Sequence, residues 1–160
     1  MKWKLAVAAI WAAAFVFAAS CAPVACAAPP TDACSLLTPA QVSAVLGLKV
    51  GAGTPLPGNS KPCHWGAAVV MAKGTKKGVM LTLQDPLAFT YAKMPAGHGI
   101  VKVPVSGIGD DAVYGTTPGY PTVLTVKKGN VVFVVHVNGF PDDQIKAKEK
   151  TLALDVVAKL

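Results

Sequence analysis

The stretch that decides the fold is TVLTVKKGNVVFVVHV, residues 122–137. Two runs rich in β-branched residues flank KKGN, a glycine-containing turn of the kind that joins two strands in a hairpin. The second run, 131–137, is apolar on both of its faces, which is typical of a strand that is buried on both sides. We therefore place this strand at the centre of a sheet, covered by helix or sheet on each face.

The segment LLTPAQVSAVLG, 36–47, carries the start and stop signals of a helix. Thr38 is suited to the N-cap and Pro39 to the first helical position. Gln41 completes a capping box with Thr38, and Gly47 ends the helix. We predict a helix over 39–46.

The chain between these two regions alternates between strand and helix patterns. In VMLTLQ, 79–84, every second residue is apolar: Val79, Leu81 and Leu83. The residues between them, Met80, Thr82 and Gln84, form a wetter face. Further strands are predicted at 63–72 and 112–115, and Asp85 is expected to cap a helix that runs to Met94. The segment 51–62 is a loop rich in glycine and proline, and 95–111 is irregular and partly extended.

The last predicted helix occupies 142–160, with Asp142 or Asp143 as its cap. Its apolar residues fall near one stripe, as expected for a helix that packs on a sheet. They are Ile145, Leu152, Val156 and Leu160. These elements predict an α+β fold, in which helices pack on the faces of an antiparallel sheet of about five strands.

The N-terminal 27 residues have the layout of a secretory signal, with two lysines before an apolar run from Leu5 to Ala19. As a helix this run reaches about 22 Å, short of the roughly 30 Å of a bilayer core, so no permanent transmembrane span is expected. Cleavage after Ala27 leaves one domain, 28–160, in a secreted or periplasmic protein. The alternative is lipid anchoring at Cys21.

The cysteine count favours the first of these two forms. Cleavage after Ala27 leaves only Cys34 and Cys63, an even pair in an oxidising compartment. We expect these two residues to form a disulfide bond. Lipidation of Cys21 would leave one thiol unpaired.

The charge of the chain argues against a nucleic-acid partner. Its formal net charge is +7, but every basic residue is lysine and there is no arginine. Nucleic-acid binding usually relies on clustered arginine with interleaved aromatic residues, and the sequence has neither. A lysine-rich, solvated surface is the simpler interpretation.

No motif for catalysis or for a cofactor is present. The chain lacks the nucleophile elbow, the phosphate loop and the dinucleotide fingerprint. Its only glutamate, Glu149, is expected on a lysine-rich helix face. We therefore expect no enzyme activity and no cofactor.

A metal site is the weaker alternative. It would combine His64, His98 and His136 with Asp110, although their spacing matches no known motif. Asp110 belongs to GIGDDAV, 107–113, which is better explained as a turn before a strand than as a cation loop.

Several of these stretches together resemble one family of exported bacterial domains of unknown function. They are DACSLLTPAQVSAVLG, CHW, VSGIGDDAVYG, TVLTVKKGNVVFVV and the terminal VVAKL. The family is related to the small lipoproteins and kinase sensor domains of actinobacteria. The resemblance implies a PsbP-like fold with a Cys34–Cys63 disulfide, and a role in sensing, in small-ligand or envelope binding, or in partner binding.

Three aromatic residues are the candidates for a ligand site. Trp65 follows the second cysteine of the pair, and Tyr114 and Tyr120 flank the loop TTPG. The predicted function is an exported, non-catalytic domain that binds a small ligand or an envelope component. A protein-interaction or inhibitor domain with a flat apolar patch is the alternative, and metal binding through the histidines is a second.

Overall fold

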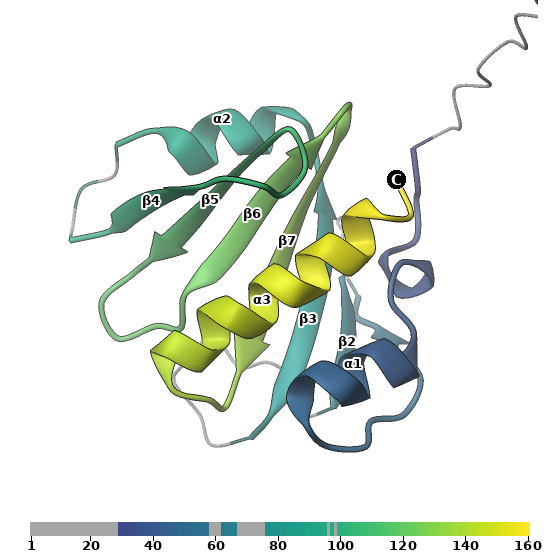
Figure 1. The fold of residues 1–160 in the computed structure, drawn as a ribbon. Coiled ribbons are helices and arrows are strands. Elements are labelled where there is room, and N and C mark those ends of the chain that lie inside the picture. The colour runs from purple at the N-terminus through teal and green to yellow at the C-terminus, as the bar shows by residue number, and fades with distance from the viewer. Residues whose placement is uncertain (1–28, 58–61, 67–75, 96, 98) are drawn as a thin grey trace, which may run out of the picture.

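The computed structural model describes residues 29–57, 62–66, 76–95, 97 and 99–160. The predicted signal sequence, with Cys21 in it, and His98 lie outside these residues. The described chain forms a 3-10 turn η1, three helices and one sheet (Figure 1). The elements are η1 (Ala33–Ser35), α1 (Pro39–Leu46), β1 (Thr54–Pro55), β2 (Cys63–Gly66), β3 (Gly78–Gln84), α2 (Leu87–Lys93), β4 (Val101–Val105), β5 (Asp111–Thr116), β6 (Val123–Lys128), β7 (Val131–Asn138) and α3 (Asp142–Val157).

The seven strands form one antiparallel sheet in the order β1-β2-β3-β7-β6-β5-β4. The α+β class is confirmed, but the expected number of about five strands is too low. The two additional strands are β1 and β4, which lie in segments predicted as a loop and as irregular chain. β1 is only two residues long, which is too short to show a period of two. The valines of β4 do alternate with Lys102 and Pro104, but a proline within a run argues against an ordinary strand, and β4 is an edge strand.

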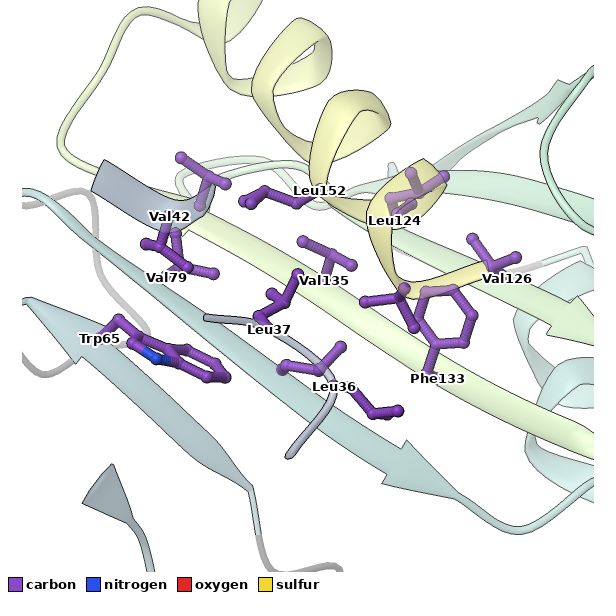
Figure 2. Packing of buried hydrophobic residues seen from close by; sticks show 14 of the residues in the cluster. Leu36, Leu37, Val42, Trp65, Val79, Leu124, Val126, Phe133, Val135 and Leu152 are labelled. Atoms are coloured by element: carbon purple, nitrogen blue, oxygen red, sulfur yellow. The ribbon is translucent and has the colours of Figure 1, made fainter. Parts of the chain in front are cut away.

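The prediction for residues 131–137 is confirmed, because β7 is the central strand and is buried on both faces. Phe133 and Val135 point into the main core, which α1 and α3 cover (Figure 2). Val132 points to the other face, where it packs with Phe89 of α2 and Val113 of β5. The helices therefore lie on both sides of the sheet, with α2 covering only part of its face.

The helix signals at the N-terminal end are also confirmed. The Thr38 hydroxyl accepts from the Gln41 N–H at 3.2 Å, and the Gln41 side chain accepts from the Thr38 N–H at 2.9 Å. Gly47 ends α1 with a φ of 68°, in the left-handed region that favours glycine. In α2 the prediction of Asp85 as the cap is wrong. The N-cap residue is Pro86 and the helix covers Leu87–Lys93, although the Asp85 side chain still accepts from the Leu87 N–H.

Helix α3 differs from its prediction at both ends. Pro141 is its N-cap residue, and no side chain caps it, so Asp142 and Asp143 lie in the first turn instead. Negative charge there is favourable beside the positive end of the helix dipole. At the other end the helix stops at Val157, and Leu160 is partly exposed rather than part of the buried stripe.

The disulfide bond between Cys34 and Cys63 is present and joins η1 to β2. It closes a loop with a sequence separation of 29 residues. Such a bond is typical of proteins that fold in an oxidising, exported environment. Within the described ranges, no helix has the length and apolar character to cross a membrane.

Candidate functional site

Trp65, the first predicted ligand residue, is a core side chain that is 1% exposed (Figure 2). It lies on the same face of β2 as Cys63, and the backbone of Gly53 packs directly against it. A Cβ atom on Gly53 would lie 2.6 Å from the Cys63 Sγ and 2.7 Å from the Trp65 Cε2. Trp65 therefore fills the region beside the disulfide.

The two tyrosines lie apart from Trp65. Tyr114 is on β5, four strands from β2, and is 8% exposed. Its hydroxyl donates to the Lys146 carbonyl oxygen at 2.6 Å, and burial together with the Glu149 carboxyl raises its pKa to about 12. Tyr120 is on the surface and 48% exposed. The structure does not gather the three aromatic side chains on one surface, and their role in ligand binding stays a prediction.

Glu149 lies in the core, so the expectation of a solvated helix face is wrong. It is 0% exposed, at the same spacing along α3 as the buried Ile145, Leu152 and Val156. Its Oε1 accepts from the Val137 N–H at 3.1 Å, just beyond Val135, where the β6–β7 pairing ends. Burial raises the pKa of this carboxyl to about 9, so it is protonated at neutral pH. Its position indicates a structural role, because it completes the hydrogen bonding of β7.

The face of the sheet opposite α3 carries a row of three donor side chains, His64, Met80 and His136. The strand register pairs His64 with Met80 and Met80 with His136, on three adjacent strands. Side chains of directly opposed residues lie on the same face of a sheet. We call these three residues the His-Met-His row.

Two nitrogen atoms of this row are buried without a hydrogen-bond partner in the described part of the chain. They are the Nδ1 of His64 and the Nε2 of His136. His136 is 4% exposed, and burial lowers its pKa, so its imidazole is neutral at neutral pH. His64 and Met80 are half-buried. Buried polar atoms in proteins are nearly always paired. The Nε1 of Trp65 and the Oε2 of Glu149 are also buried without a partner, but they lie in the core. The two imidazole nitrogens share one row on the other face of the sheet, which makes this row the candidate ligand site.

Asp110, the fourth residue of the predicted metal site, is engaged elsewhere. Its carboxylate accepts from the Gly129 N–H at 2.6 Å and pairs with Lys128 at 3.1 Å, and these contacts lower its pKa. Gly107 and Gly109, which precede it, both have positive φ. These contacts match the turn interpretation of GIGDDAV. Across the residues that are described, no three His, Cys, Asp or Glu side chains are grouped for a metal ion.

Two hollows on the surface are lined by residues of the described part of the chain. The larger, of about 540 Å³, lies between α2, the start of β5 and the β6–β7 turn, and the smaller, of about 260 Å³, lies at the start of α3. Both aspartates of the larger hollow are already paired, Asp111 with Lys93 and Asp110 with Lys128. The smaller hollow includes Pro121, next to the exposed Tyr120. Neither hollow presents an unpaired buried group of the kind found on the His-Met-His row.

Comparison of the chain with protein-family models, curated proteins and solved structures finds no significant match. The resemblance to the exported bacterial family therefore stays a prediction. The fold and the disulfide define an antiparallel α+β domain whose most distinctive polar feature is the His-Met-His row. Sequence reasoning identified His64 and His136 but not Met80, whose position on the wetter face of its strand was the available signal.

Proposed function

We propose that this chain is an exported, non-catalytic domain that binds a small ligand or an envelope component on the sheet face opposite α3. The observation that carries the proposal is the pair of unpartnered, buried nitrogens on His64 and His136. A bound ligand would supply the missing partners, and it would reach them beside the half-buried Met80. The Cys34–Cys63 disulfide supports export.

The non-catalytic part of the proposal rests on the carboxyl groups. Catalysis by a pair of carboxyl groups, as in glycoside hydrolysis, needs both groups to converge on a substrate. Glu149 is enclosed in the core and hydrogen-bonded to β7, while Asp110 and Asp111 are paired with lysines. Among the described residues beside the His-Met-His row, Thr82 and Val134 oppose each other on the same face of the sheet, and both are uncharged.

Native mass spectrometry of the protein purified from its own host tests this proposal. We expect a native mass greater than that of the polypeptide, and we expect His64→Gln to remove the excess, because it replaces one of the two unpartnered imidazoles. Asp110→Asn, a matched polar change away from the row, should keep it. A native mass equal to the polypeptide, or an excess unaffected by His64→Gln, would contradict binding at this face.

A protein-interaction role is the second candidate, and the exposed face of α2 favours it. Leu87 and Tyr91 are 66% and 68% exposed, and Met94, three residues after Tyr91, is 47% exposed. This spacing places Leu87 and Tyr91 on one side of α2, and Met94 directly follows the helix. Large apolar side chains gathered on a surface are typical of contacts with another protein.

The test of this second role is capture of a partner from the host envelope. We expect the Leu87→Ser/Tyr91→Ser variant to lose at least about 90% of any protein that co-purifies stoichiometrically with the wild type, since interface aromatics carry much of the binding energy. Leu154→Ser is the control, because Leu154 is an exposed apolar residue on α3. Equal capture by both variants would exclude the α2 face as the contact.

A further inference from the structure

We propose that the exposed side of α2 and the larger hollow beside it form a contact site for an anionic lipid bilayer. Leu87, Tyr91 and Met94, which we call the α2 ridge, enter the apolar layer, and Lys127 meets the lipid phosphates. This inference goes beyond the proposed function, because it uses α2 and the hollow rather than the His-Met-His row and requires no ligand at that row.

The α2 ridge points away from the sheet. At about 100° per residue, Leu87 and Tyr91 lie about 40° apart around the helix. Phe89 lies on the opposite side of α2 and is buried against Val113 and Val132 of the sheet. The two most exposed apolar side chains of the helix are therefore directed outward, and such side chains mark a surface that contacts a partner or a membrane.

The larger hollow adjoins the α2 ridge and carries more positive than negative charge. Thr90, about 60° around the helix from Leu87, lines the hollow together with Lys93. Lys93 and Lys128 are each paired with an aspartate of the hollow. Lys127 also lines the hollow, is exposed, and makes no ion pair with any described residue. An anionic group placed here would therefore meet one positive charge that no carboxylate offsets.

A bilayer matches both parts of this surface better than a protein does. An anionic bilayer presents phosphates directly above an apolar layer, so lysines and apolar side chains that lie next to each other can contact both at once. A stable protein interface uses roughly 20–30 residues a side, far more than the three of the α2 ridge. The formal net charge of +7 adds attraction to an anionic surface and outweighs the Asp85 carboxylate beside Leu87.

The position of the N-terminal chain agrees with a membrane on this side. β3 ends at Gln84, shortly before α2, and α2 and the first described residues lie at the same end of the molecule (Figure 1). A lipid on Cys21, the alternative form considered from the sequence, would precede Pro29 by eight residues, which span at most roughly 29 Å. In that form the α2 ridge would lie within reach of the membrane that holds the anchor.

The experiment is co-sedimentation of the protein, purified from its own host, with lipid vesicles at low and high salt. The vesicles are phosphatidylcholine alone, or phosphatidylcholine and phosphatidylglycerol in equal parts. We expect binding to the phosphatidylglycerol vesicles that salt weakens. Leu87→Ser/Tyr91→Ser should weaken it at least about tenfold, since it removes two apolar side chains that the bilayer would bury. Leu154→Ser, a change of an exposed apolar residue on α3, is the control.

A second pair of variants tests the charged part of the site. Lys127→Gln should weaken binding to the phosphatidylglycerol vesicles about fivefold, the contribution of one lysine near an anionic surface. Lys150→Gln removes the same charge from an exposed position on α3 and should bind like the wild type. Circular dichroism of each variant verifies that the fold is intact.

The outcomes separate a membrane site from its alternatives. Vesicle binding that both α2-side changes reduce, and that both α3 changes leave intact, supports the proposal. Absence of vesicle binding, or binding that Leu87→Ser/Tyr91→Ser leaves unchanged, overturns it. Equal binding by Lys127→Gln and Lys150→Gln also overturns it, because net charge alone would then drive adsorption. A protein that co-purifies through Leu87 and Tyr91, without vesicle binding, replaces the membrane by a protein partner. The native mass assigned to the His-Met-His row is measured separately, so the proposed function can fail or hold independently.

Discussion

Glu149→Gln should raise the stability of the protein at pH 8 and remove most of the decline in unfolding free energy between pH 5 and pH 9. The pKa of Glu149 is about 9 in the folded protein, against an ordinary value of 4.5. A carboxyl whose pKa is raised by folding contributes stability that is fully present below pH 4.5. That contribution is lost as the pH rises through 9, because the unfolded chain releases the proton first.

The expected size of this effect follows from the linkage between protonation and folding. Each pH unit inside the window changes the unfolding free energy by about 1.4 kcal/mol, so the wild type at pH 7 has lost about 3 kcal/mol relative to pH 4.5. Glutamine does not titrate, and its carbonyl oxygen can still accept from the Val137 N–H. The unfolding free energy of the Glu149→Gln variant should therefore not decline with pH in this way.

Urea unfolding from pH 5 to pH 9 measures the effect, and the difference between the two curves isolates residue 149 from other titrating groups. Gln144→Glu is the control, since residue 144 is an exposed position on the same helix. A carboxyl added there should leave the slope above pH 5 unchanged. Parallel curves for wild type and Glu149→Gln would mean that the carboxyl is ionised or solvated in the folded protein.

Removal of the disulfide should lower the unfolding free energy by an amount similar to the change expected from the titration of Glu149. The Cys34→Ala/Cys63→Ala variant loses the closure of a loop with a separation of 29 residues, which corresponds to about 3.6 kcal/mol in the chain-entropy model. That is a large share of the unfolding free energy of a folded domain, which is typically about 5–15 kcal/mol. We therefore expect a much lower midpoint of urea unfolding for the variant.

Reduction provides the internal control for this measurement. A thiol reductant should lower the unfolding midpoint of the wild type toward that of the double variant and leave the double variant unchanged. The reduced protein should gain the mass of two hydrogen atoms. An unfolding midpoint of the wild type that is insensitive to reduction would show that the bond does not stabilise the fold.

Local signals in the sequence predicted the parts of the fold that depend on neighbouring residues. Thr38 and Gln41 are three residues apart, so their capping box is visible in the sequence and is confirmed. The hairpin around KKGN is local as well, and both strands are present. The central place of β7 followed from its composition, because only a strand covered on both faces is apolar throughout.

Features that depend on distant pairing could not be predicted in this way. The His-Met-His row depends on the register in which β2, β3 and β7 pair. The separation of its residues along the chain does not predict that they are neighbours in the sheet. Glu149 was misplaced for a related reason. A glutamate among lysines is expected to face the solvent. In the structure its carboxyl instead accepts from the Val137 N–H, beyond the end of the β6–β7 pairing, and this contact is not visible in the sequence.

The strand order has a consequence for how copies of this protein behave when they are crowded together. The two outer strands of the described sheet are β1 and β4. β1 offers only Thr54 and Pro55, and β4 carries Pro104, which has no N–H to donate, next to Val103. Short outer strands and proline hinder the addition of another strand from a neighbouring molecule. The sheet is thus protected at both borders against fibre-like growth, although its central strand is among the most β-prone segments in the chain.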